Sequence, residues 1–176
     1  MITFSTKKGA ACCVATTAMT FDVFPEVSTK DSWTLLSHPE EELTDKKVVS
    51  WPGEYDFSGI SVRGIGQEGG KQISYVCTTE NVRIGFIDGP ILDWTDIDIQ
   101  HLGEVDVLVV AADNAKKVVT LVEAVDPRVV ILFETKDGDL SGTAKACGTA
   151  QIQKVDEFKV KAGSLPQDSR QVVVLG

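Results

Sequence analysis

The sequence predicts a mixed α/β fold in which sheets are flanked by helices. Two observations lead to this prediction. The first half of the 176-residue chain is a series of short apolar segments interrupted by Gly, Pro, Asn and charged residues, which is typical of neighbouring strands. The second half alternates apolar runs with a helical pattern, as in a strand–helix–strand unit. No linker or repeat divides the chain, so we expect one domain over residues 1–176.

In the first half, β-branched and aromatic residues favour strands. We expect strands over residues 11–16, 20–24, 33–37, 47–51, 58–65, 71–79 and 81–88. Residues 67–71 and 80–81 have the composition of hairpin turns, because Gly and Asn tolerate positive φ. The first half is therefore expected to be almost entirely β-structure.

In the second half, residues 105–112 and 128–134 are continuous apolar runs, as expected for strands covered on both faces. Between them, Asn114 is expected to cap a helix over residues 115–125, whose valines and leucine recur at helical spacing. A short helix over 138–147, a strand near 151–155 and a closing strand over 171–176 complete the prediction.

The chain is acidic, with 17 basic and 26 acidic side chains and a net charge of −9. Such a surface repels phosphate backbones, and the lysines are scattered, so we expect no nucleic-acid or anionic-membrane partner. No apolar run approaches the roughly 20 residues of a membrane helix. No long apolar stretch follows the first lysines, so we expect no signal peptide.

Four cysteines are present, Cys12, Cys13, Cys77 and Cys147, and none forms a CxxC pair. A cysteine zinc site is therefore not indicated, and without an export signal we expect free thiols in the cytoplasm. Cysteine catalysis would need a positioned histidine, and the chain has only His38 and His101. We expect His101 to lie near the end of a helix.

The segment after residue 37 contains His38, Glu40 and Glu42. Closely spaced imidazole and carboxylate groups at a strand end can converge on one cation. The same residues also fit an exposed acidic loop, and the segment alone does not decide between the two.

The segment Trp51-Pro52-Gly53-Glu54-Tyr55 is a tight turn, since Pro fixes φ and Gly permits positive φ. It could present Glu54 and Tyr55 at the rim of a site. It could equally be structural, with Glu54 bonded to backbone amides and Tyr55 packed.

Two carboxylates end apolar strands. Asp88 follows one strand directly, and Glu134 ends another. A carboxylate at a strand end is a common ligand or catalytic position, but Asp is also a common turn former. A carboxylate after buried residues needs a partner or access to water.

The order of the segments WTLLSHP, WPGEYDFSGISVRGI, ISYVCTTENVRIGFIDG, HLGEVDVLVVAADN and AVDPRVVILFET resembles the bacterial metal-dependent hydrolase branch of the metallo-β-lactamase superfamily. That branch includes the ascorbate-6-phosphate lactonase-like proteins. The ending FKVKAGSLPQDSRQVVVL also resembles it, so the resemblance covers nearly the whole chain. It implies a shortened αββα sandwich, in which two sheets face one another with helices outside.

The resemblance also implies which residues stand at the metal site. Where the family carries a His-x-His-x-Asp-His run, only His38 is kept, and Glu40, Glu42 and Leu43 stand at the other positions. Asp88 matches the bridging aspartate, which makes it the candidate catalytic residue. Glu134 stands where a histidine closes the site. A zinc hydrolase needs about three protein ligands, usually imidazoles, and an open position for water.

Three functions therefore remain open. The first is a non-catalytic homologue without a cofactor. The second is a hydrolase of a phosphoester or lactone, whose oxygen-rich site suits Mg²⁺, Mn²⁺ or Ca²⁺ better than Zn²⁺. It alone implies a small-molecule substrate, and its carboxylates would repel one another without metal, so that stability rises as pH falls. The third is a binding or assembly module, a homo-oligomer with Trp33, Trp51 and Trp94 at an interface.

Overall fold

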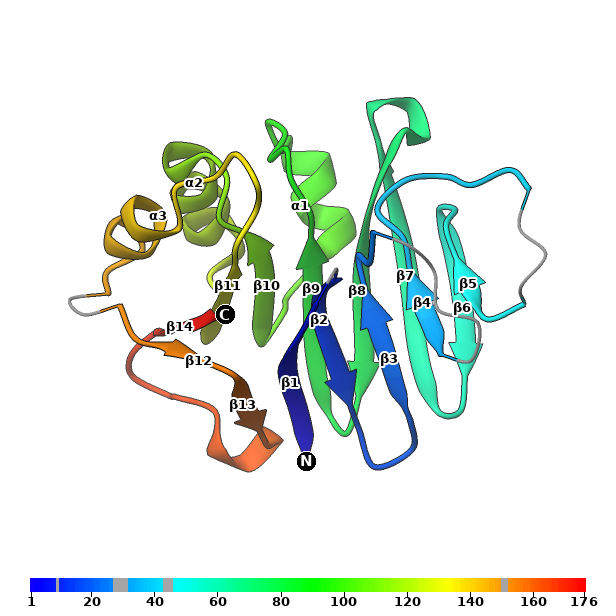
Figure 1. Cartoon of the computed structure of the whole chain (residues 1–176), viewed down its shortest axis with the longest axis horizontal. Helices are drawn as coiled ribbons and strands as arrows, with labels where there is room; N and C mark the ends of the chain where they lie inside the picture. Colours follow the sequence, from blue (N-terminus) through cyan, green and yellow to red (C-terminus); the bar gives the residue numbers. More distant parts are fainter. Residues whose placement is uncertain (9, 27–31, 43–45, 150–151) are drawn as a thin grey trace.

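The computed structural model describes residues 1–8, 10–26, 32–42, 46–149 and 152–176. Two β-sheets lie face to face, and three α-helices pack against the larger one (Figure 1). The predicted mixed α/β class and the two-sheet sandwich are confirmed. In the described residues, the helices α1 (Asp96–Leu102), α2 (Ala115–Val125) and α3 (Leu140–Ala146) contact strands of the larger sheet.

In the described residues, the smaller sheet has six strands, the first five strands of the chain and β13. Its order is β13 (Glu157–Val160), β1 (Ile2–Lys7), β2 (Ala10–Ala15), β3 (Thr20–Val23), β4 (Trp33–Leu35) and β5 (Val48–Val49). The β1–β2–β3 part is antiparallel, whereas β4 runs parallel to both β3 and β5.

The larger sheet has eight strands and combines both halves of the chain. Its order is β12 (Lys154–Val155), β14 (Gln171–Leu175), β11 (Val129–Phe133), β10 (Val107–Ala111), β9 (Val82–Ile87), β8 (Gln72–Thr79), β7 (Ile60–Gln67) and β6 (Gly53–Phe57). The strands β9, β10, β11 and β14 are parallel. Their carboxyl ends therefore meet at one edge of the sandwich, which is where ligands bind in parallel sheets.

The strand–helix–strand unit matches its prediction. The helix α2 spans the predicted residues, and the Asn114 side chain accepts a hydrogen bond from the Lys117 N–H at 3.1 Å. Val118, Leu121 and Val122 are buried, as their spacing predicts. His101 lies in the last turn of α1, as expected. Two short 3₁₀ helices cover Glu68–Gly70 and Ala162–Ser164, the first inside the predicted hairpin turn.

Three strands were not predicted. In β1, Ile2 and Phe4 are buried while the alternate residues are partly exposed, and this alternation is a strand signal. The strand β6 lies where we expected only a turn, and its residues are mostly exposed because it forms a sheet edge. The strand β13 is also short and mostly exposed. The helix predicted over residues 138–147 is α3, which is shorter, and the strand predicted near 151–155 is found as β12, with residue 151 outside the described residues.

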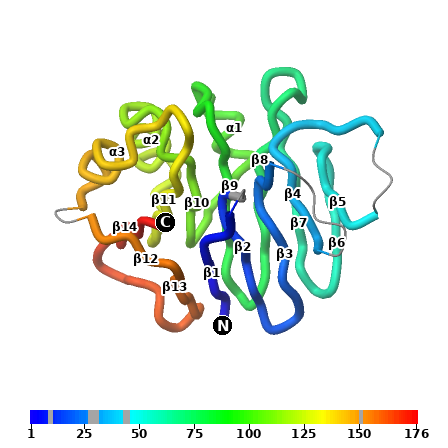
Figure 2. The backbone as a smooth tube through the Cα atoms, in the orientation of Figure 1, coloured from blue at the N-terminus to red at the C-terminus, as the bar shows by residue number. Residues whose placement is uncertain are grey.

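The N-terminal and C-terminal parts of the chain meet in the smaller sheet. The strands β1 and β13 lie side by side (Figure 2), and Ile2 pairs with Val160 and Phe4 with Phe158 in an antiparallel register. One edge of the smaller sheet is therefore formed by β13, which is far in the sequence from its neighbour β1.

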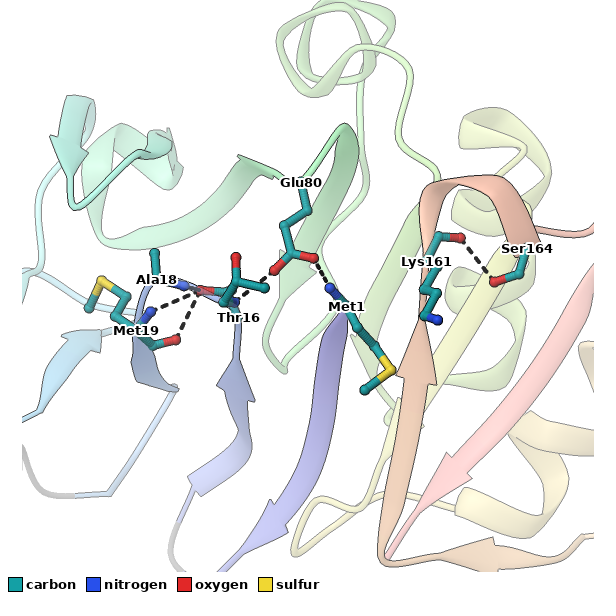
Figure 3. A network of polar contacts seen from close by, with 8 residues as sticks. Met1, Thr16, Ala18, Met19, Glu80, Lys161 and Ser164 are labelled. Carbon is teal, nitrogen blue, oxygen red and sulfur yellow. Dashed lines mark hydrogen bonds and ion pairs between the residues drawn. The ribbon is translucent and has the colours of Figure 1, made fainter.

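Glu80 links the two sheets at the end of the sandwich opposite the carboxyl ends of β9–β11. This residue lies in the turn between β8 and β9, where Glu80 and Asn81 both have positive φ. Its carboxylate accepts hydrogen bonds from the Met1 α-ammonium and, at 2.7 Å, from the Thr17 N–H (Figure 3). These contacts lower the pKa of Glu80 and tie the two sheets together.

Aromatic side chains fill the space between the two sheets. Phe21 and Phe86 meet edge to face, with ring centroids 6.3 Å apart, and Phe24 lies 6.1 Å from Tyr75. Tyr75 is fully buried, and its hydroxyl lies 2.6 Å from the Leu36 carbonyl oxygen and 2.9 Å from that of Val49. A residue of β8 is therefore hydrogen-bonded to the smaller sheet.

Within the described residues, no helix is long and apolar enough to cross a membrane.

Candidate functional site

A cavity of about 720 Å³ opens where β9, β10 and β11 end. We call it the sheet-end pocket. Phe24 and Phe133 give it apolar walls, and its lining includes His38 and Lys136. Five carboxylates also line it: Glu26, Asp88, Asp113, Glu134 and Asp137. The pocket is therefore strongly acidic.

The structure brings His38, Asp88 and Glu134 to this pocket. Asp88 is partly buried and accepts a hydrogen bond from the Gly89 N–H at 2.9 Å and another from Ser37. Burial raises the pKa of the Asp88 carboxyl, while the Ser37 and Gly89 bonds and the nearby His38 act in the opposite direction. The sequence predicted a raised carboxylate pKa from mutual repulsion, whereas its cause at Asp88 is burial.

Glu134 is mostly exposed, and its carboxylate lies 2.9 Å from the Lys154 ammonium. Glu40 and Glu42 are exposed and do not line the pocket. The Glu40 backbone is held instead: its N–H lies 3.4 Å from the Ser50 hydroxyl, and its carbonyl accepts from the Trp51 indole at 3.4 Å. Leu43 lies outside the described residues. Of the residues in the 38–42 segment, only His38 reaches the pocket.

Sequence reasoning missed Asp113, which follows β10 in the same way that Asp88 follows β9. Its carboxylate accepts a hydrogen bond from the Ile91 N–H at 2.9 Å, so it holds the loop after Asp88. The available signal was its place directly after the apolar run of residues 105–112.

The start of β8 fixes both sides of the pocket. The Ile73 N–H donates to the Ser37 carbonyl at 2.8 Å, next to His38. The Gln72 side-chain amide donates to the carbonyls of Asp88 at 3.1 Å and Pro90 at 3.3 Å. Two adjacent residues thus position the His38 and Asp88 segments relative to one another.

The turn that contains Glu54 and Tyr55 lies away from this pocket. Tyr55 is half-buried and donates a hydrogen bond to the Trp51 carbonyl at 2.8 Å, whereas Glu54 is exposed in β6 opposite Arg63. The turn also passes close over Gly64, where a Cβ atom would lie 2.7 Å from the Trp51 carbonyl oxygen. These contacts favour the structural interpretation of the turn.

We therefore expect Gly64→Ala to lower the free energy of unfolding by about 1–3 kcal/mol, because the added methyl group meets backbone that must shift. Gly163→Ala is the matched control, since its Cβ would meet nothing within 4 Å. Urea denaturation followed by tryptophan fluorescence measures both. Equal unfolding midpoints for the two variants would contradict the close packing of the turn.

The three tryptophans occupy different environments. Trp33 stacks on Phe57 with ring centroids 4.0 Å apart, Trp51 is 46% exposed, and Trp94 is half-buried. The tryptophans do not form one exposed patch, so an interface built on all three stays a prediction.

Among the cysteines, Cys12 and Cys77 are buried, whereas Cys13 and Cys147 are partly exposed.

Across the described ranges, no three His, Cys, Asp or Glu side chains are grouped so that they could hold a metal ion. The described residues of the pocket do not match a hydrolase zinc site, because the pocket offers one imidazole, and three of its five carboxylates already bind protein donors. The cavity itself is large enough for a small molecule.

Among solved structures, the chain is similar to a proposed Zn-dependent hydrolase of the metallo-β-lactamase superfamily from Thermotoga maritima. The two are 18% identical with a TM-score of 0.77, over 99% of each chain. The chain also resembles the metallo-β-lactamase fold protein YhfI from Bacillus subtilis, at 8% identity and a TM-score of 0.63, over 98% of this chain and 96% of YhfI.

A third similar structure is a proposed metal-dependent hydrolase from Parabacteroides distasonis, at 11% identity and a TM-score of 0.63, over 98% of this chain and 92% of that one. No protein-family model matches the sequence. No curated protein matches it either. At these identities the comparisons establish the metallo-β-lactamase fold and leave the activity open.

Proposed function

We propose that the protein is a non-catalytic homologue of the metal-dependent hydrolases with this fold, and that it acts by binding a ligand in the sheet-end pocket. One observation carries the proposal. Three of the five carboxylates at the pocket are bound by protein donors that belong to its frame: Asp88 by Gly89, Asp113 by Ile91 and Glu134 by Lys154. They hold loops and strands in place, and a single imidazole remains beside them.

We further propose that residues 1–176 form one domain and that the protein works in the cytoplasm, where its cysteines stay reduced. A homo-oligomer is compatible with it, and light scattering coupled to size-exclusion chromatography would measure the mass.

A metal-dependent hydrolase is the second candidate. One observation favours it: His38, Asp88 and Glu134, which lie far apart in the sequence, line the same cavity. Oxygen ligands suit Mg²⁺ or Mn²⁺ better than Zn²⁺. On this hypothesis, a phosphoester or lactone would be the substrate, and Asp88 would orient the attacking water.

Metal content distinguishes the two. The untagged protein is equilibrated with Zn²⁺, Mn²⁺, Mg²⁺ and Ca²⁺, and bound metal is measured by plasma mass spectrometry after desalting. We expect less than stoichiometric retention of every metal. Retention of one metal per chain, lost in His38→Ala and Asp88→Asn but kept in the control Glu54→Gln, would overturn the proposal in favour of the hydrolase.

A further inference from the structure

A second cavity lies on the outer side of the larger sheet, and its lining shares no residue with that of the sheet-end pocket. It has a volume of about 390 Å³ and lies between the segment leading into α1 and the exposed side of α2. We call it the helix groove. Its lining is Leu92, Asp93, Trp94, Ile99, Asn114, Lys116, Lys117, Thr120, Leu121 and Ala124. The lining residues of α2 follow one another from its first turn to its last, so the groove extends about 12 Å along the helix.

The two ends of the groove differ in chemistry. At the N-terminal end of α2 lie Asn114, Lys116 and Lys117. The Lys117 ammonium is 3.1 Å from the Asp93 carboxylate. Lys116 is exposed and makes no ion pair within the residues that the structure describes. The N-terminus of a helix attracts anions through its free N–H groups and its dipole. Two lysines and Asp93 line the groove, so its lining has one positive charge in excess, that of Lys116, in a chain with a net charge of −9.

The other end of the groove is apolar, because Ile99, Leu121 and Ala124 line it together. This end of the groove thus presents apolar surface, whose burial by a ligand favours binding, next to the positive end.

Trp94 adds an independent observation. Its indole nitrogen is buried and has no hydrogen-bond acceptor among the described residues. Buried donors are normally satisfied, so an unpaired one needs an explanation. Trp94 also lines the groove, so a bound ligand would contact its side chain.

We propose that the helix groove binds an amphipathic monocarboxylate with an unbranched alkyl chain. The carboxylate lies beside Lys116 and the first turn of α2, and the chain follows the groove toward Ala124. Charge complementarity selects an anion, and the length and apolar far end of the groove select an extended chain over a compact ligand.

The test uses octanoate and 1-octanol as matched probes that differ in charge. Binding is measured by Trp94 fluorescence in the Trp33→Phe/Trp51→Phe variant and by calorimetry of the unaltered protein. We expect saturable binding of octanoate, up to about fivefold tighter than that of 1-octanol, the upper end of what one exposed ion pair supplies. Hexanoate should bind more weakly than octanoate, by about fourfold for each missing methylene group.

Three variants locate the site. Lys116→Gln should weaken octanoate binding up to about fivefold and leave 1-octanol binding unchanged, whereas Lys71→Gln, the same charge change elsewhere on the surface, should alter neither. Ala124→Leu fills the apolar end at an exposed helix position and should abolish binding of both probes without loss of fold. Asp88→Asn, in the other pocket, should have no effect. Equal affinities for the two probes, unchanged binding in Ala124→Leu, or no saturable binding would overturn the proposal.

Discussion

Raising the pH from 7 to 10 is expected to lower the free energy of unfolding by about 4 kcal/mol, at about 1.4 kcal/mol per pH unit for each buried thiol that ionises only when unfolded. Cys12 and Cys77 are both fully buried, and burial raises the pKa of each thiol. Below the unfolded-state pKa of about 8.5 the thiols are neutral in both states. Above it the unfolded chain loses protons that the folded chain keeps, so stability falls.

Urea denaturation at each pH, in the presence of a reductant, measures this loss. The double variant Cys12→Ala/Cys77→Ala is the control, because it cannot lose these two protons on unfolding. Its stability should fall less steeply between pH 8 and 10 than that of the parent. Parallel curves for parent and double variant would show that the two thiols do not contribute.

Replacing Tyr75 by Phe is expected to lower the free energy of unfolding by about 1–3 kcal/mol, since it removes the donor from carbonyl groups in a buried site. The Tyr75 hydroxyl lies between the Leu36 and Val49 carbonyl oxygens of the facing sheet. Tyr55→Phe makes the same chemical change at a half-buried site, where water can replace the hydrogen bond to Trp51. It should cost less than about 1 kcal/mol.

The same substitution should also loosen the His38 segment, because Leu36 precedes it by two residues. Hydrogen exchange measures this effect. We expect faster exchange at Ser37 and His38 in Tyr75→Phe than in the parent, with the amides of α2 unchanged. Uniformly faster exchange across the protein would mean that the hydroxyl contributes to global stability alone.

Sequence reasoning predicted most of the elements whose own residues specify them, although it missed β1, in which buried and partly exposed residues alternate. The helix α2 has a capping Asn114 and a regular apolar face, and β10 and β11 are apolar throughout. The strands β6 and β13 escaped notice because they are short, exposed sheet edges that owe their conformation to a neighbouring strand. Local composition carries little information on such pairing.

The candidate site divides in the same way. Asp88 was found because it directly follows an apolar strand, and Asp113 has the same signal. His38 and Glu40 are two residues apart, yet only His38 reaches the pocket. The contacts that decide this, from Ile73 to Ser37 and from Ser50 to the Glu40 backbone, join segments that are distant in sequence. Residue types and their spacing alone do not reveal these long-range contacts.

The pairing of β1 with β13 has a consequence for biosynthesis. As the ribosome releases the chain from its N-terminus, β1, β2 and β3 emerge early, but the strand that covers β1 arrives only with residues 157–160. Until then β1 is an open sheet edge that can pair with other chains. Non-local pairing of this kind slows folding. The nascent protein is therefore prone to aggregate until β13 docks on β1, and chaperones that shield strand edges would act in that interval.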